Sequence, residues 1–331
     1  LAEGINVQPG NAALQVIPMY FNAGGPAQMY QFGKAGTGVI LEEFSPSNFL
    51  QAVQEHRITH TILVPTMLNM IVNHPEVERY DVSSIRCIIM GGSPLPAPLL
   101  RRGREIFGDV FFPRYGMTET YSLGLLLDRQ DQHSDGPERL TRRLKSAGKP
   151  EPGMECRVVN EQGEDVAWGS GEAGEILLRG PTVCRGYWNL PEETANALRD
   201  GWMHTGDMAT VDEDGYIYIV DRKKDIIITG GINVYSVEIE QVIATHPAVS
   251  MVAVIGVPDE QWGEAIQACV VLKPGQTTTE EEIIRWCRDR LASYKKPKYV
   301  QFLTDMPLSG TGKILKRVLR ERYWAGLDRK I

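Results

Sequence analysis

The chain has 331 residues, of which 42% are hydrophobic, so it can bury a large core and form more than one structural unit. Its 35 lysines and arginines against 42 aspartates and glutamates give a formal net charge of -7, which argues against a nucleic-acid partner, because neutralising phosphates requires a basic surface. Its apolar runs are shorter than the ~20 residues that cross a bilayer. The five cysteines are scattered, as expected in a reducing compartment. We expect a cytoplasmic protein without integral membrane association.

From residue 12 to about residue 127, strand-like and helix-like runs alternate. Ser45 and Pro46 predict a helix start, as N-cap and first helical residue. The pattern predicts buried strands over 61–65, 84–90 and 110–116, and helices over 67–73 and 96–107. This alternation predicts βαβ crossovers and a largely parallel sheet, on which ligands bind at the carboxyl ends of strands. The segments GGSPLP (91–96) and YGMTE (115–119) both follow such ends.

The pattern then changes twice. Residues 128–146 are polar and predict a surface loop, and the short alternating runs over 148–220 predict a small β-barrel or sandwich. Farther on, Thr279 and Glu282 predict the capping box of an amphipathic helix over 277–291. We therefore expect an α/β chain with a partial large domain, made of an α/β subdomain (1–127) and a β-barrel subdomain (128–220). A smaller, mobile α+β domain (221–331) follows a hinge at Asp221.

Residues 201–240 place several charged residues and a glycine pair around one short predicted hairpin. They are Asp207, Asp221, Arg222, Lys223 and Lys224, with Gly230 and Gly231. Asp207 follows a His-Thr-Gly turn, which holds its carboxylate on sharply bent backbone. Such a carboxylate can accept hydrogen bonds from two vicinal hydroxyls, the geometry of a ribose 2′,3′-diol. Taken alone, the segment is also compatible with a charged surface hairpin.

Two further segments carry groups suited to a nucleotide. In YGMTE, Tyr115 offers a flat face for adenine, Thr118 a hydroxyl for the α-phosphate, and Glu119 a hard oxygen ligand for Mg²⁺. In PLSGTGKILKRVLR (307–320), Lys313 leaves a glycine-bearing loop just before a basic helix. A P-loop is not indicated, because Ile314 stands where that motif requires a hydroxyl.

Four segments together resemble, in order and rough spacing, the adenylate-forming enzymes (the AMP-dependent synthetase and ligase superfamily), in particular its acyl-CoA synthetase branch. They are GGSPLP (91–96), YGMTE (115–119), residues 201–240 and residues 307–320. The resemblance covers about Pro18 to Tyr323. Members of this family carry a Ser/Thr/Gly-rich loop ending in Pro-Lys-Gly, which wraps the ATP phosphates, and the printed sequence contains none. We therefore expect the C-terminal part of a longer enzyme, and we expect the isolated chain to be inactive.

The resemblance implies a role for each matching position. Lys313, Thr118 and Glu119 would be catalytic, with Glu119 also the metal ligand, Asp221 the hinge, and Gly230 with Gly231 the surface for the pantetheine arm. The nucleotide-binding residues would be Gly92, Ser93, Pro94, Tyr115, Gly116, Met117, Thr118, Asp207, Ile219, Arg222 and Lys313. Tyr20, Phe21 and Gly25 are the candidates for the acyl pocket, and Phe21 stands where many members have histidine.

The function that the resemblance implies is an ATP-dependent acid–CoA ligase of the kind used in fatty acid metabolism. It would form an acyl-adenylate and then an acyl-CoA thioester, using ATP, Mg²⁺ and CoA with a medium-length or aromatic carboxylic acid. Two alternatives stay open: an adenylation domain that loads a carrier-protein phosphopantetheine, and a truncated AMP-binding fragment without turnover. The identity of the acid and homodimer formation are open as well.

Overall fold

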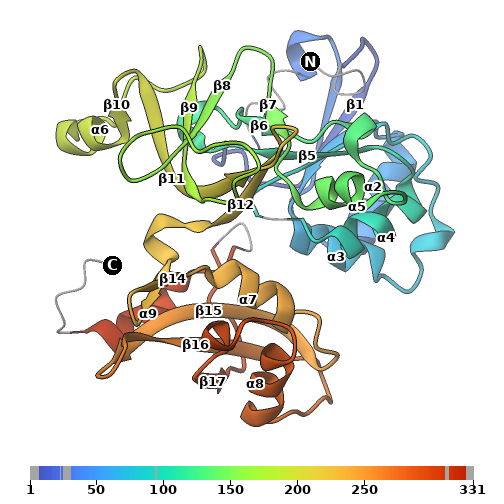
Figure 1. The fold of residues 1–331 in the computed structure, drawn as a ribbon. Helices are drawn as coiled ribbons and strands as arrows, with labels where there is room; N and C mark the ends of the chain where they lie inside the picture. The colour runs from blue at the N-terminus through green and yellow to red at the C-terminus, as the bar shows by residue number, and fades with distance from the viewer. Residues whose placement is uncertain (1–6, 23, 25–30, 94, 310–312, 326–331) are drawn as a thin grey trace. The chain divides into compact units, whose positions relative to one another are not determined.

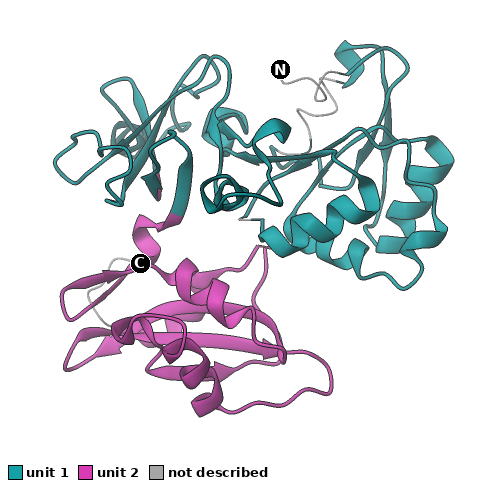
Figure 2. Ribbon diagram, turned by 45° about the vertical axis from the view of Figure 1, so that its right-hand side comes forward, with its two compact units in different colours: residues 1–205, 209–219 teal, residues 206–208, 220–331 magenta. Residues whose placement is uncertain are grey.

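The structure is a computed structural model that describes residues 7–22, 24, 31–93, 95–309 and 313–325. The chain divides into two compact units (Figure 2). Unit 1 comprises the residues up to Thr205 together with Ala209–Ile219, and unit 2 comprises Gly206–Met208 and the residues from Val220 onward. The last crossing between the units therefore falls between Ile219 and Val220.

Unit 1 is built on a seven-stranded sheet with the order β2-β1-β3-β4-β5-β6-β7. Its strands are β1 (Ala12–Gln15), β2 (Thr37–Ile40), β3 (His60–Leu63), β4 (Cys87–Met90), β5 (Phe111–Tyr115), β6 (Leu125–Leu126) and β7 (Lys149–Pro150). Strands β1 to β5 pair in parallel, and β6 and β7 add antiparallel pairs at one edge. The predicted α/β class with a largely parallel sheet is confirmed.

Three helices lie together beside this sheet: α2 (Pro46–His56), α3 (Pro65–Val72) and α4 (Ala97–Phe107) (Figure 1). Ser45 caps α2 as predicted, since its hydroxyl accepts from the Asn48 backbone amide at 3.1 Å. The predicted strand 61–65 was too long at its end, because Pro65 is the first residue of α3. The fully buried side chains of Phe49, Leu100 and Phe111 fill the space between helices and sheet.

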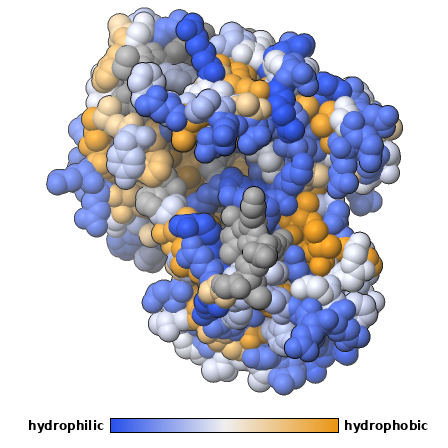
Figure 3. Space-filling view, turned by 90° about the vertical axis from the view of Figure 1, so that its left-hand side faces the viewer, coloured by the Kyte–Doolittle hydropathy of each residue, from blue (hydrophilic) through white to orange (hydrophobic). Residues whose placement is uncertain are grey.

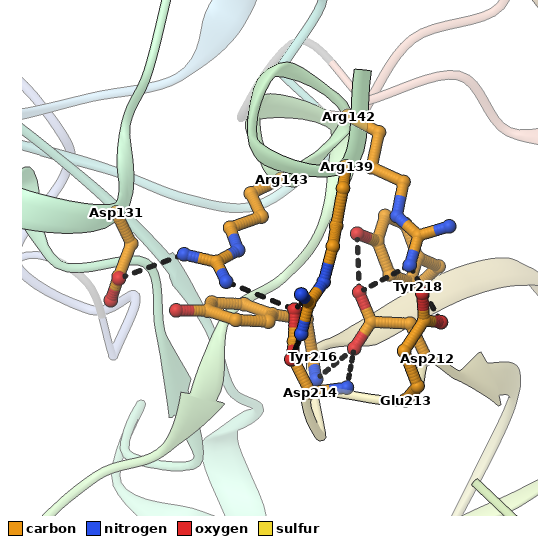
Figure 4. A network of polar contacts seen from close by, with 9 residues as sticks. All are labelled: Asp131, Arg139, Arg142, Arg143, Asp212, Glu213, Asp214, Tyr216 and Tyr218. Atoms are coloured by element: carbon orange, nitrogen blue, oxygen red, sulfur yellow. Dashed lines mark hydrogen bonds and ion pairs between the residues drawn. The ribbon is translucent and has the colours of Figure 1, made fainter. Parts of the chain in front are cut away.

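The stretch 128–146 is not simply the loop that was predicted. It contains α5 (Glu138–Thr141) and two 3₁₀ turns, η3 (Arg129–Asp131) and η4 (Arg142–Lys145). Its arginines bind the acidic turn 212–214: Arg139 and Arg143 pair with Asp214, and Arg142 pairs with Glu213 (Figure 4). The ion pairs and the Tyr216 ring beneath Arg143 order this stretch, which lacks the apolar periodicity of a predictable helix.

The strands predicted as a small barrel pair as one five-stranded sheet with the path β10-β11-β9-β8, in which β12 also pairs with β11. They are β8 (Glu155–Val159), β9 (Gly174–Arg179), β10 (Leu198–Arg199), β11 (Trp202–Val211) and β12 (Ile217–Arg222), and α6 (Pro191–Ala197) precedes β10. A buried cluster that includes Ile176, Met203 and Val211 forms its core. The turn between β11 and β12 is the acidic turn that the arginines hold.

Unit 2 is built on a sheet with the path β14-β13-β16-β15, to which β17 adds beside β16. Its strands are β13 (Ile227–Thr229), β14 (Ile232–Val234), β15 (Val249–Asp259), β16 (Gly263–Leu272) and β17 (Tyr299–Phe302), and its helices are α7 (Ser236–Ile243), α8 (Glu280–Arg288) and α9 (Lys316–Trp324). The predicted capping box of α8 is formed, because Thr279 and Glu282 each accept from the other's backbone amide.

Alternate residues of β15 face opposite sides of this sheet. Val254 packs in one buried cluster with Ile239 of α7 and Ile283 of α8, whereas Ala253 and Ile255 pack in another with Leu319 of α9. Helix α9 therefore covers the sheet face opposite to that covered by α7 and α8.

The remaining short turns are η1 (Val77–Arg79), η2 (Thr118–Thr120), η5 (Lys223–Asp225) and η6 (Ser293–Lys295). In the described part of the chain, a helix with the length and apolar character needed to span a membrane does not occur. On the face drawn in Figure 3, hydrophilic residues predominate and hydrophobic residues occur in separate small groups.

Candidate functional site

Two candidate segments of unit 1 leave the sheet at the same edge. Strands β4 and β5 are parallel neighbours, with Met90 opposite Pro113, so the residues after each strand emerge side by side. Gly92 and Ser93 follow β4 and are exposed, whereas Pro94 lies outside the described residues. The YGMTE segment begins with Tyr115, the last residue of β5.

The loop after Tyr115 is tightly folded. A Cβ atom on Gly116 would lie 2.5 Å from the carbonyl carbon of Ser122, so only glycine allows this approach. Tyr121 and Ser122 have φ angles of 57° and 59°, in the left-handed region that non-glycine residues rarely adopt. Such strain persists only where the surrounding structure imposes it, and it is common at functional sites.

Hydrophobic packing joins three of the predicted nucleotide residues in unit 1. Tyr115, Met117 and Ile219 all pack against the buried cluster of the second sheet. Tyr115 and Met117 remain half-buried, so each keeps part of its side chain available to a ligand.

Glu119 is held by contacts with a distant loop. The Tyr187 hydroxyl donates to Oε1 of Glu119 at 2.8 Å, and the Cys184 amide donates to the Glu119 carbonyl oxygen at 2.7 Å. Partial burial, and then the bond to Glu119, raise the pKa of Tyr187 to about 12, so the phenol stays a donor at neutral pH. With one carboxylate oxygen bound by Tyr187, the other suits Mg²⁺, which commonly takes one or two protein carboxylates together with substrate phosphates. Thr118, next to it, is exposed.

A buried ion pair supports the base of the same loop. Nη2 of Arg114 lies 2.8 Å from Oε2 of Glu151, and their side chains are only 13% and 5% exposed. Oε1 of Glu151 also accepts from the Gly124 amide at 3.3 Å. Burial raises the pKa of Glu151, while the charge of Arg114 acts in the opposite direction. The pair thus ties β5 to the far end of the loop.

The predicted acyl-pocket segment contacts this loop as well. The side-chain amide of Asn22 donates to the Ser122 hydroxyl at 2.7 Å. Phe21 packs against the main core, and Tyr20 is 80% exposed, with its ring centroid 4.5 Å from that of Phe21. Gly25 lies outside the described residues. The acyl-pocket assignment stays a prediction.

In unit 2, Asp207 and Arg222 form an ion pair, and Lys313 lies within reach of the charges of both. Nε of Arg222 lies 3.3 Å from Oδ1 of Asp207, in an ion pair between β11 and β12. Desolvation lowers the pKa of Lys313, the charge of Arg222 lowers it further, and the charge of Asp207 opposes both. Two contacts join the ends of the Lys313 loop. Leu308 and Ile314 form a β-bridge, and the Ser309 amide donates to the Lys313 carbonyl oxygen at 2.8 Å. Its residues 310–312 lie outside the described residues.

Gly230 and Gly231 form the turn between β13 and β14, and both have positive φ angles, of 57° and 78°. The Gly230 amide donates to the Trp262 carbonyl oxygen at 2.9 Å, and a Cβ on Gly230 would meet the Trp262 ring at 2.9 Å. Apart from Gly231 itself and its two chain neighbours, no atom of the described residues lies within 4 Å of the position of a Cβ at Gly231. The turn is therefore packed on one side and open at Gly231.

Sequence reasoning missed Tyr187, Arg114 and Glu151. Tyr187 lies in a turn, where no apolar or charge pattern marks it, and Arg114 was read as part of a buried strand. A buried strand that contains arginine implies an acidic partner, so Arg114 was the one detectable signal of the three.

Known proteins give an independent comparison. Residues 2–188 match the family model described as AMP-binding enzyme, and residues 238–313 match the AMP-binding enzyme C-terminal domain. The feruloyl-CoA synthase of an Amycolatopsis species is 44% identical over 290 residues, which are 88% of this chain and 57% of that protein. The fatty acid–[acyl-carrier-protein] ligase ScoC of Streptomyces coeruleorubidus is 37% identical over 328 residues, which are 99% of this chain and 62% of that protein. The chain thus spans about 60% of the length of these relatives.

The fold has solved counterparts. The o-succinylbenzoate CoA synthetase MenE of Bacillus subtilis, in complex with the acyl-adenylate intermediate OSB-AMP, superposes with a TM-score of 0.84 at 33% identity, over 96% of this chain and 62% of that chain. Another structure of MenE holds ATP and a magnesium ion. Because the family model covers more than half of its residues, the chain belongs to the AMP-binding enzyme family.

Proposed function

We propose that this chain is the part of an acid–CoA ligase that carries the adenylate site and the C-terminal domain. The observation that carries the proposal is the grouping of Asp207, Arg222 and Lys313 in unit 2. A carboxylate for a ribose diol, a guanidinium and a lysine are the groups needed to hold a nucleotide beside an activated carboxylate. Feruloyl-CoA synthase and MenE, both named as forming CoA derivatives, support the CoA ligase class.

Forming an acyl-adenylate joins a carboxylate to the α-phosphate of ATP and releases pyrophosphate. The site must therefore hold both anions and neutralise the charge that grows on the α-phosphate. Lys313 and Arg222 supply positive charge, and Asp207 orients the ribose. Tyr115 stacks on adenine, with Gly92, Ser93, Pro94, Gly116, Met117 and Ile219 around the base. Thr118 donates to the α-phosphate. Glu119, steadied by Tyr187, holds Mg²⁺, which would screen the phosphate charge when bound.

Thioester formation requires a thiol to reach the adenylate. We propose that the domain formed by residues 221–331 turns about Asp221 between the two steps, which brings the Gly230–Gly231 turn in place of Lys313. The open space at Gly231 supports this role, because a thin pantetheine arm can approach backbone there without meeting side chains. The resulting domains would be 1–127, 128–220 and 221–331.

The test is pyrophosphate release by the full-length protein that carries this chain, across medium-length and aromatic acids, with and without CoA. We expect pyrophosphate with a subset of acids and, when CoA is present, the matching acyl-CoA in the mass spectrum. Absence of pyrophosphate with every acid, under both conditions, would overturn the proposal.

The acceptor could instead be a carrier protein, which the match to the acyl-carrier-protein ligase ScoC favours as a second candidate. Supplying a phosphopantetheinylated carrier protein and CoA in parallel separates the two acceptors. We also propose that the 331-residue polypeptide alone binds AMP but does not release pyrophosphate, because its sequence contains no Pro-Lys-Gly loop. Robust turnover by that polypeptide would contradict this. Cytoplasmic location and homodimer formation remain predictions.

A further inference from the structure

Two basic residues on α9 are turned inward. Lys316 and Arg320 are one helical turn apart, so they lie on the same helix face. The side chain of Lys316 is 15% exposed and that of Arg320 is 6% exposed, whereas Arg317 between them is 71% exposed. The basic end of the chain is therefore only partly a solvated surface.

Lys316 reaches the start of unit 2 through one intermediary. Its Nζ donates to the Ser236 hydroxyl at 2.6 Å, and that hydroxyl donates to Oδ2 of Asp221 at 2.8 Å. The other oxygen of Asp221 accepts from the Arg222 amide at 2.7 Å. Ser236 and Asp221 are both buried, at 0% and 2% exposure. A continuous polar chain thus runs from α9 to the point where the backbone enters unit 2.

The same lysine joins two helices that pack on opposite faces of the sheet. Nζ of Lys316 lies 2.7 Å from Oε1 of Glu240 on α7, and this oxygen also accepts from the Val254 amide at 2.7 Å. Val254 belongs to β15, the edge strand. The Lys316–Glu240 pair therefore crosses the sheet edge. Its Glu240 carboxylate also accepts from the Val254 amide, which an edge strand would otherwise leave unpaired.

Arg320 binds the other end of the segment 221–225, with which the backbone enters unit 2. Its Nη1 donates to the Lys224 carbonyl oxygen at 2.8 Å, and its Nη2 lies 2.5 Å from Oδ1 of Asp225. One face of α9 thus binds both ends of residues 221–225, with Lys316 reaching Asp221 through Ser236 and Arg320 contacting Asp225 directly. We call Lys316, Arg320 and the groups they bind the α9 clamp.

Stability alone is a poor explanation for the α9 clamp. Buried ion pairs often contribute no more to folding than a well-packed apolar group of similar volume, because desolvation offsets their attraction. What they do provide is a specific geometry. Lys313 lies three residues before Lys316, and Arg222 lies within residues 221–225. The clamp therefore sets the separation between Lys313 and the Asp207–Arg222 pair.

We propose that Lys316 and Arg320 are positioning residues, which fasten the segment that follows Lys313 to residues 221–225 and so align Lys313 for adenylate formation. The expected effect on adenylate formation rests on the proposed function, whereas the contacts of the α9 clamp do not depend on it. Since misplacing a reacting group by about 1 Å can slow a reaction about 100-fold, loosening the clamp should slow the step that uses Lys313. Thioester formation from a supplied acyl-adenylate should be spared, because in our account it does not use Lys313.

The experiment compares four variants of the full-length protein, the fourth being Lys316→Arg. Ser236→Ala removes the bridging hydroxyl, and Lys316→Met with Glu240→Gln removes both charges of the Lys316–Glu240 pair. Arg317→Gln is the matched control, on the same helix but exposed. Hydrogen exchange of the amides in 221–225 and 316–324 reports the clamp independently of activity. ATP–pyrophosphate exchange and thioester formation from a supplied acyl-adenylate report the two half-reactions.

We expect both clamp variants to exchange the 221–225 amides at least about tenfold faster than the wild type, and to slow adenylate formation about 10- to 100-fold. Thioester formation should change less than about twofold, and Arg317→Gln should match the wild type throughout. Lys316→Arg, which keeps the charge, should restore part of the adenylation rate.

Unchanged hydrogen exchange in both clamp variants would overturn the clamp, whatever the activity. Faster exchange with equal losses in both half-reactions would overturn the positioning role and leave a general structural one. If the wild type itself formed no adenylate with any acid, the proposed function would fail, and hydrogen exchange would still decide the clamp.

Discussion

Tyr187 donates a 2.8 Å hydrogen bond to Oε1 of Glu119, a residue 68 positions earlier in the chain. The bond fixes one oxygen of the candidate metal ligand and leaves its other oxygen for a cation. Outer partners of this kind orient metal ligands, and removing them commonly weakens metal binding 10- to 100-fold.

Replacing Tyr187 with Phe should therefore raise the Mg²⁺ concentration needed for half-maximal adenylate formation by about tenfold, while the rate at saturating Mg²⁺ stays within about threefold. Titrating Mg²⁺ in a pyrophosphate-exchange assay measures this. Tyr80→Phe removes a phenol far from Glu119 in sequence and is the control. An unchanged Mg²⁺ requirement in Tyr187→Phe would show that the bond does not serve metal binding.

Asp207→Ala should weaken AMP binding by about 10- to 100-fold, since hydrogen bonds to a charged group contribute about 1.5–3 kcal/mol. The loss should depend on the ribose. Wild type should bind 2′-deoxy-AMP more weakly than AMP, whereas Asp207→Ala should barely distinguish them. Calorimetry measures both, and Asp165→Ala, which removes a surface partner of Arg157, is the control. Equal discrimination in wild type and Asp207→Ala would exclude the ribose role.

Gly231→Leu should spare adenylate formation and slow thioester formation by at least about tenfold, because a side chain would fill the open approach and strain a positive φ angle. Gly275→Leu has a similar φ of 75° and equally open surroundings, so it controls for backbone strain alone. Equal slowing of both half-reactions by Gly231→Leu would refute the pantetheine assignment.

The rate of adenylate formation should fall on the alkaline side at a pH below 10.5, the ordinary lysine value. Desolvation and then the charge of Arg222 lower the pKa of Lys313, so its folded form loses the proton earlier as pH rises. Lys313→Arg keeps its charge above pH 12 and should abolish this alkaline limb, although its neutral-pH rate will be lower. If both proteins lost activity at the same alkaline pH, another group would be responsible.

Local sequence signals predicted much of the fold. Ser45 with Pro46, and Thr279 with Glu282, marked helix starts correctly, because caps form among residues close in sequence. Alternating apolar strands and helices indicated the parallel sheet. The turns of 128–146 were missed, because arginine pairs with Asp212–Asp214 order them, and such pairs join residues some 70 positions apart.

The candidate site was predictable only where resemblance marked it. Asp207, Arg222 and Lys313 were named from motifs, and in unit 2 Lys313 lies within reach of the charges of the Asp207–Arg222 pair. The residues that hold the site were not named. Tyr187, Glu151 and Ser236 act through polar contacts with residues 15 to 80 positions away, which leave no periodicity in the chain.

The central proposal is that AMP binding by this chain uses both Tyr115 and Asp207. The direct measurement is calorimetric binding of AMP to the full-length wild type, to Tyr115→Ala, to Asp207→Ala and to the double variant. The account predicts one AMP per chain and weaker binding in each single variant. Two AMP sites per chain, or a variant in either unit that binds AMP as tightly as the wild type, would contradict it.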